Sequence, residues 1–253
     1  MISLEQLVTA VFAVGLRVSG VLLFAPVIGS SALPARVKVG LAVALTALLF
    51  PAMHVRIPLN GIAWLHVGFS ELIIGIFLGL TTNIVFEGAQ FAGQILGIQM
   101  GYSLVTVLDP TTQADTPVLA LFYQMIATLI FLRLNVHHWL LRGVARSFEL
   151  LPSGTMLSSG AVVKSALHSS SAIWVCGLQI AAPALLATMV ADVILAFIGK
   201  ASPQLPVMLI GVSLKSTLGL LTTIAALALW PGWFECHFAE SIASMERLLR
   251  LAH

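Results

Sequence analysis

The sequence predicts an all-α, polytopic membrane-type protein whose helices are kinked and paired into hairpins. Its composition favours this class, because 59% of the 253 residues are hydrophobic and only 9% are charged, with a mean hydropathy of +1.04. Soluble globular proteins lie far from these values. The apolar residues also form separate runs of roughly bilayer-spanning length. Prolines lie inside or at the edges of these runs, so we expect kinked helices.

Six apolar segments are candidates for helices in the membrane, although some are slightly short for a full span. Because no Lys or Arg precedes the first segment, we expect it to be retained rather than removed as a signal peptide. Two hydrophilic stretches, 86–117 and 133–171, interrupt the series, and an amphipathic tail follows at 235–251. The six segments are 8–28, 37–53, 62–85, 118–132, 173–198 and 207–230.

A run of small residues at a spacing of four lies in the first hydrophilic stretch. Residues at this spacing share one face of a helix, and small side chains let two helix backbones approach closely. We therefore expect this small-residue run to pack helices in a tight protein contact or around a pore. It consists of Ala89, Gly93, Gly97 and Gly101.

A polar loop follows directly, within an otherwise apolar chain. Irregular polar backbone at membrane depth persists only where protein covers it or where it lines water. Asp109 and Asp115 could contribute to a cation ring, but as turn formers near prolines they are equally well explained. The loop could also be a surface connector between two helices. Its candidate site residues are Val105, Thr106, Val107, Leu108, Asp109, Pro110, Thr111, Thr112, Gln113, Asp115, Thr116 and Pro117.

Ionisable residues occur within or beside nearly every apolar segment. Each is unfavourable against lipid, by about 2.5–3.5 kcal/mol at a helix centre on insertion scales, so these side chains should face protein or water. Lys38 and Arg133 lie near segment ends, where a long side chain can reach the interface. Four others lie well inside, and we expect them to pair within an assembly, although the sequence does not choose the partners. These four are Arg17, Glu71, Asp192 and Lys215.

A hairpin turn is predicted at 199–206, between the last two apolar segments. Two prolines in four residues cannot continue a helix. We also expect Pro183 to kink or break the helix that contains it. The candidate residues of the turn are Lys200, Pro203, Gln204 and Pro206.

The sequence offers little support for an enzyme, a metal site or a cofactor site. It contains no H-E-x-x-H, G-x-S-x-G or phosphate-loop pattern. His137 and His138 are adjacent and point to different faces of a helix, so a metal site is not expected there. The 12 basic and 10 acidic residues nearly balance, which gives no sign of nucleic-acid binding. We expect a protein without catalytic residues, metal or cofactor.

Several motifs together resemble the FliR family of flagellar export-gate proteins, which is homologous to SctT of type III secretion injectisomes. The resemblance covers essentially the whole chain, in order. Single pieces are weak, but the set is specific. The motifs are Arg17-Val18-Ser19-Gly20 with Ala25-Pro26, Leu33-Pro34-Ala35-Arg36, Glu71 with Gly75 and Gly79, Gly93-Gln94 with Gly97-Ile98-Gln99-Met100-Gly101, Asp109-Pro110, and Ser202-Pro203-Gln204 with Gly211 and Lys215.

The resemblance implies a non-enzymatic core subunit of an export channel in the bacterial inner membrane, at the flagellar basal body. It implies a single domain, 1–253, with a FliP-like front at 1–171 and a FliQ-like helical hairpin and tail at 172–253. The implied partners are FliP-like and FliQ-like subunits in a helical ring, an FlhB-like and an FlhA-like component, and unfolded protein substrates. The polar loop near 105–117 would be a plug that projects into the channel.

The main alternative is a secondary transporter or proton-conducting channel, in which Glu71 and Asp192 would titrate during a transport cycle. Such folds commonly contain internal repeats, and none is evident in this sequence. The sequence therefore favours the export subunit.

If the polar loop is a plug, deleting residues 106–116 should leave the complex assembled but permeable to small solutes. Slowed growth and ion or dye leakage on overexpression would report this change. An assembled, ion-tight complex, together with a loop open to bulky thiol reagents in a single-cysteine variant, would identify an ordinary connector instead.

Overall fold

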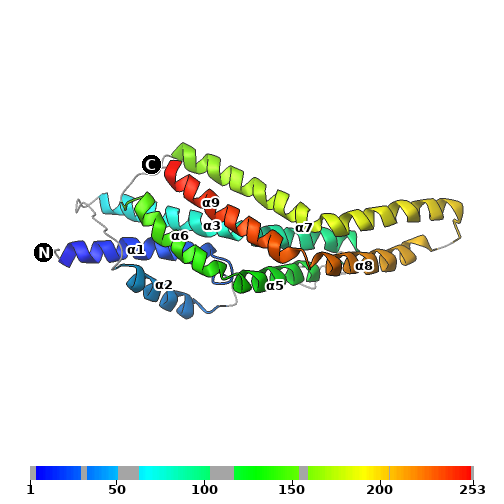
Figure 1. Cartoon of the computed structure of the whole chain (residues 1–253), viewed down its shortest axis with the longest axis horizontal. Helices are drawn as coiled ribbons and strands as arrows, with labels where there is room; N and C mark the ends of the chain where they lie inside the picture. Colours follow the sequence, from blue (N-terminus) through cyan, green and yellow to red (C-terminus); the bar gives the residue numbers. More distant parts are fainter. Residues whose placement is uncertain are drawn as a thin grey trace. The chain divides into compact units, whose positions relative to one another are not determined.

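The computed structural model describes residues 4–29, 33–50, 63–102, 117–153, 159–204 and 206–251. All regular structure in these ranges is helical (Figure 1), which confirms the all-α prediction. The helices are α1 (Leu4–Phe24), α2 (Ala35–Leu49), α3 (Ala63–Gln99), α5 (Val118–Arg133), α6 (Val136–Leu150), α7 (Ser159–Ala201), α8 (Val207–Ala226) and α9 (Trp230–Leu251).

The two hydrophilic stretches are more helical than the apolar pattern predicts. Helix α3 continues from the third apolar segment through most of the small-residue run and ends at Gln99. The second stretch contains α6 and the first turns of α7. The first stretch is rich in small residues and the second is amphipathic. Both patterns are compatible with a helix, but neither raises the local hydropathy, so the apolar segments did not include them. Pro183 lies inside α7, which continues beyond it to Ala201.

Three helices of the described residues are long and apolar enough to cross a membrane, or up to five spans if each of two bent helix pairs counts as one. The bent pairs are α5 with α6 and α8 with α9. Fewer single helices therefore qualify than the six apolar segments suggest. Helix α2, with 15 residues, is only about 22 Å long, shorter than the ~30 Å hydrocarbon core.

The chain divides into two compact units. Unit 1 comprises Met1–Ile84, Phe131–Ser171 and His237–His253. Its buried core draws on α1, α3, α6 and the last part of α9, and α2 packs against it. Helix α6 contributes a stripe at a spacing of four, and Met245 of α9 closes the core beside it. The α6 stripe is Val136, Leu140, Val144 and Phe148.

Unit 2 comprises Val85–Ile130 and Ala172–Cys236. Between α7 and α8 the chain turns back on itself (yellow to orange in Figure 1). The Tyr123 hydroxyl of α5 lies 3.1 Å from the Thr223 hydroxyl of α8, and the Tyr123 ring packs on Trp230 with centroids 4.9 Å apart. Unit 2 contains segments from both sides of residue 171, where the sequence analysis divides the chain. The expected division into a FliP-like part at 1–171 and a FliQ-like part at 172–253 stays a prediction.

Close backbone contacts in unit 2 depend on glycines of α3. A Cβ atom added at Gly93 would lie 2.5 Å from Cα of Ala120 in α5. One added at Gly88 would lie 2.9 Å from Cβ of Cys176 in α7. Because backbone atoms cannot move aside as a flexible side chain can, α3 and α5 require glycine at 93.

We expect Gly93→Ala to lower the thermal unfolding temperature of the purified chain, because the added methyl group meets the α5 backbone. Gly40→Ala is the matched control, since a Cβ there meets nothing within 4 Å and alanine favours a helix by about 1 kcal/mol over glycine. Equal unfolding temperatures for the two variants would contradict the close α3–α5 contact.

Candidate functional site

Three glycines bring α1 and α3 into close contact in unit 1. A Cβ atom added at Gly20 would lie 2.6 Å from the Leu72 carbonyl oxygen, and one at Gly79 would lie 2.6 Å from the Val21 carbonyl oxygen. A Cβ at Gly75 would collide with the Arg17 carbonyl oxygen. The two backbones therefore touch over two helical turns. One turn before Gly75 on α3 lies Glu71, and three residues before Gly20 on α1 lies Arg17.

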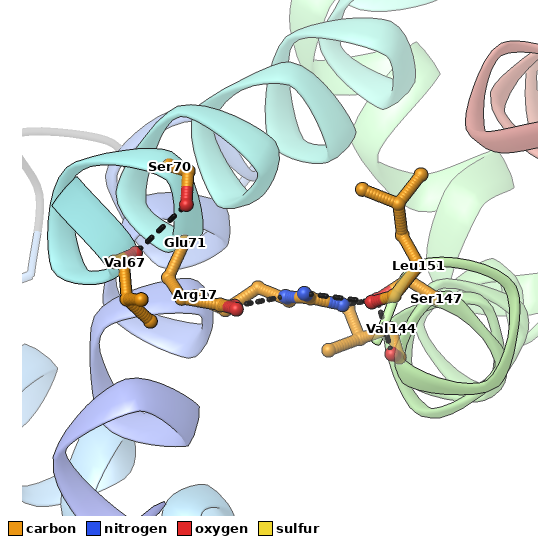
Figure 2. A network of polar contacts seen from close by, with 7 residues as sticks. All are labelled: Arg17, Val67, Ser70, Glu71, Val144, Ser147 and Leu151. Atoms are coloured by element: carbon orange, nitrogen blue, oxygen red, sulfur yellow. Dashed lines mark hydrogen bonds and ion pairs between the residues drawn. The ribbon is translucent and has the colours of Figure 1, made fainter. Parts of the chain in front are cut away.

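Arg17 and Glu71 form an ion pair with no exposed surface on either side chain. Nε of Arg17 donates to Oε2 of Glu71 at 2.5 Å. Figure 2 shows the guanidinium between Glu71 of α3 and the C-terminal end of α6. Opposite charges at this distance in a region shielded from water attract strongly, which offsets part of the loss of their hydration.

The rest of the guanidinium binds the end of α6. One terminal nitrogen donates to the Ser147 hydroxyl oxygen at 3.0 Å, and the other donates to the Leu151 carbonyl oxygen at 3.1 Å. The Ser147 hydroxyl itself donates to the Val144 carbonyl at 2.6 Å (Figure 2). Carbonyl groups at a helix C-terminus carry partial negative charge and lack partners in the helix, so a cation there is favourable.

An aromatic ring completes the surroundings of Arg17. The guanidinium carbon lies 3.9 Å from the centroid of the Phe148 ring, a distance at which the ring's quadrupole attracts a cation. Arg17 thereby connects α1, α3 and α6 through charge, hydrogen bonds and stacking. We call Arg17, Glu71, Ser147, Phe148 and Leu151 the arginine hub.

One atom of the hub is left without a partner among the described residues. Oε1 of Glu71 is buried and receives no hydrogen bond. A buried carboxylate oxygen without a donor is unfavourable by about 1–3 kcal/mol or more. Among the described residues, Arg17 supplies the one side-chain hydrogen bond and ion pair of Glu71.

A second ion pair lies in unit 2. Nζ of Lys215 on α8 lies 2.9 Å from Oδ1 of Asp192 on α7, and Nε2 of Gln99 donates to Oδ2 of the same carboxylate at 2.7 Å. One turn away, the Tyr102 and Ser216 hydroxyls lie 2.6 Å apart. Unlike the arginine hub, this pair is partly open, with 44% of the Asp192 side chain exposed.

The structure thus joins the four predicted charges into two pairs within the chain, Arg17 with Glu71 and Lys215 with Asp192. Their role in an assembly stays a prediction. Of the polar loop 105–117, only Pro117 is described, immediately before α5. The other loop residues lie outside the described residues. Groups of acidic, histidine or cysteine side chains that could hold a metal do not occur in the described ranges.

The small-residue run divides by position. Ala89, Gly93 and Gly97 lie buried in α3, whereas Gly101 follows the helix with a φ of 84°. Glycine adopts this left-handed conformation readily, and it is common where a helix ends. Gly101 therefore ends α3 instead of packing it.

The predicted turn residues lie at the connection between α7 and α8. Lys200 lies in the last turn of α7. Pro203 and Gln204 follow the helix, and Pro206 precedes the first residue of α8. All four are exposed.

Sequence reasoning missed the partners of Arg17 on α6 and the packing role of Gly20, Gly75 and Gly79. The glycines at 75 and 79 have the same spacing of four as the run that was singled out. The apolar stripe of α6 was also readable within the second hydrophilic stretch. No sequence signal, however, joins α6 to α1.

Comparisons with known proteins place this sequence among bacterial export proteins. The profile of the family described as bacterial export proteins, family 1, matches residues 8–241. The flagellar biosynthetic protein FliR of Escherichia coli K12 is 33% identical over 89% of this chain and 87% of its own length. FliR of Pectobacterium carotovorum is 30% identical over 88% and 86%. FliR of Bacillus subtilis 168 is 28% identical over 98% of both chains.

We expect Arg17→Met to destabilise the chain by about 3–5 kcal/mol, because it leaves the buried Glu71 carboxylate unpaired. The double variant Arg17→Met/Glu71→Leu should lose less than the sum of its single variants in a free energy of unfolding measured in mixed micelles. Arg142→Met, at an exposed position on α6, is the control and should change stability by under about 0.5 kcal/mol. Additive losses in the double variant would contradict the coupling.

Proposed function

Because the chain belongs to the family of bacterial export proteins that includes FliR, we propose that it is a non-enzymatic core subunit of the type III protein export gate. In this role it forms part of the channel through which unfolded flagellar proteins cross the inner membrane. The names of the relatives, flagellar biosynthetic proteins, support a component of the flagellar export apparatus. A corresponding role in an injectisome rests only on the resemblance of the sequence to SctT.

The observation that carries the proposal is the position of Asp192. Its side chain is 44% exposed and is paired with Lys215, and exposed apolar residues lie beside it on α7, with Met189 at 52% and Val193 at 57%. Exposed aliphatic side chains suit lipid or protein, but a partly open ion pair at their edge is unfavourable against lipid. A protein partner that covers this face satisfies both requirements.

Along α7, Leu186 and Phe197 share a helix face with Met189 and Val193, and both are more than half exposed. Leu221 and Ile224 of α8 are more than half exposed as well. Exposed apolar side chains in such numbers are typical of a protein or membrane contact. We propose FliP-like and FliQ-like subunits as the partners in this contact, arranged in a helical ring, with FlhB-like and FlhA-like components beside them.

The polar loop 105–117 is proposed as the plug of this channel. Support comes from its polar residues within an apolar chain and from the family resemblance. Of the described residues that flank it, Tyr102 contacts Ser216, and Pro117 accepts the first backbone hydrogen bond of α5, from the Leu121 N–H at 3.2 Å. The leakage experiment on residues 106–116 separates a plug from a connector.

The transporter alternative requires acids that change protonation during a cycle. Glu71 and Asp192 are both held in ion pairs, one fully buried and one partly open. Each pair joins two helices of the chain, which supports structural roles for both acids and favours the export subunit over the transporter.

Neutralising one member of the Asp192–Lys215 pair should reduce assembly with the FliP-like and FliQ-like partners more than neutralising both. Asp192→Asn leaves the Lys215 ammonium without its carboxylate, and Lys215→Met leaves the carboxylate without its ammonium. Yield of the purified complex is the measurement, with Glu240→Gln, at an exposed position of α9, as the control. Full assembly of every variant with loss of transport alone would favour the transporter.

A further inference from the structure

An open apolar groove runs between α1 and α2 in unit 1. It extends from Val11 to Ser19 on α1, and from Ala42 on α2 to Phe50, the residue that follows this helix. Its volume is about 560 Å³, within the range of roughly 300–1,000 Å³ that is typical of small-molecule sites. None of the described side chains that line it is charged. The Thr46 hydroxyl donates to the Ala42 carbonyl at 2.7 Å, so it is already satisfied.

The lining of the groove suits hydrocarbon. Apart from Ser19 and Thr46, the described side chains that line it are apolar. The nine residues along either wall rise by about 12 Å. An extended acyl chain can lie along these walls without leaving a polar group of its own unpaired.

A cation lies at one end of this surface. Arg36 precedes Val43 of the groove by seven residues, so both lie on the same face of α2. Its side chain is exposed, and no ion pair or hydrogen bond joins it to another described residue. Helix α2 contains no acidic residue. A cation in the first turn of a helix opposes the macrodipole, and a bound anion would offset this effect.

The neighbouring cation is already engaged. Nζ of Lys38 donates to the Gly29 carbonyl oxygen at 2.9 Å, which leaves Arg36 as the cation of α2 that is open to a ligand. Hydrocarbon along the groove and a negative group at Arg36 are the two parts of an anionic phospholipid. We propose that the α1–α2 groove binds an acyl chain of such a lipid and that Arg36 binds its phosphate.

The first test fills the groove. Ala47→Phe places a ring in it, whereas Ala44→Phe changes an exposed alanine of the same helix that does not line the groove. Each variant is purified as the full chain, with and without its export partners, and phosphatidylglycerol retained per chain is measured by mass spectrometry. We expect retention to fall in Ala47→Phe and to match the unsubstituted chain in Ala44→Phe.

The second test removes the charge. In nanodiscs that contain phosphatidylglycerol and phosphatidylcholine, Arg36→Gln should weaken the preference for the anionic lipid roughly fivefold, the effect of one arginine near an anionic surface. Arg142→Gln, at an exposed arginine of α6, should leave the preference unchanged. The proposal fails if Ala47→Phe and Ala44→Phe retain equal lipid, or if Arg36→Gln and Arg142→Gln behave alike. It also fails if a Val43→Cys variant crosslinks to a partner chain in the assembled complex.

Discussion

Unit 1 depends on one arginine. Arg17 binds Glu71, the Ser147 hydroxyl and the Leu151 carbonyl, and it stacks on Phe148. All of these groups are buried with it, so the polar groups of α1, α3 and α6 meet in a region shielded from bulk solvent. A guanidinium can do this because its donors point in several fixed directions within one plane. A lysine in the same place would supply charge to Glu71 but could not reach the same set of acceptors.

The glycine contact between α1 and α3 makes the hub possible. Where Gly20 and Gly75 meet, the helix axes are as close as two backbones allow. Glu71 is one turn from Gly75, and the short Oε2 to Nε distance follows from that closeness. The small residues and the buried charges, which are separate features of the sequence, are therefore parts of one arrangement.

The sequence predicted the class of fold because composition and apolar run length depend on no tertiary contact. It also singled out Arg17, Glu71, Asp192 and Lys215, since a charge within an apolar run is unfavourable wherever it points. It could not pair them, because Arg17 and Glu71 are 54 residues apart and the α6 partners of Arg17 lie 130 and 134 residues away. Such pairings depend on the relative register of three helices, which no local pattern encodes.

Local patterns were also ambiguous about Gly101. A spacing of four cannot distinguish a glycine that packs a helix from one that ends it, because the difference is a backbone angle. Likewise, the average hydropathy of the stretch 133–171 is low although α6 has a buried face. An average does not record on which side of a helix the apolar residues lie.

The acceptors around Arg17 have a consequence for how the family can diverge. Exchanging the two charges, with an acid at 17 and a base at 71, would keep the pair neutral but direct a carboxylate at the Leu151 carbonyl and at a Ser147 hydroxyl whose proton is already donated to Val144. The polarity of the pair is therefore fixed by uncharged neighbours. A sequence without this pair must replace both charges and supply another donor for the end of α6. Each single replacement on that route leaves a buried polar group unpaired.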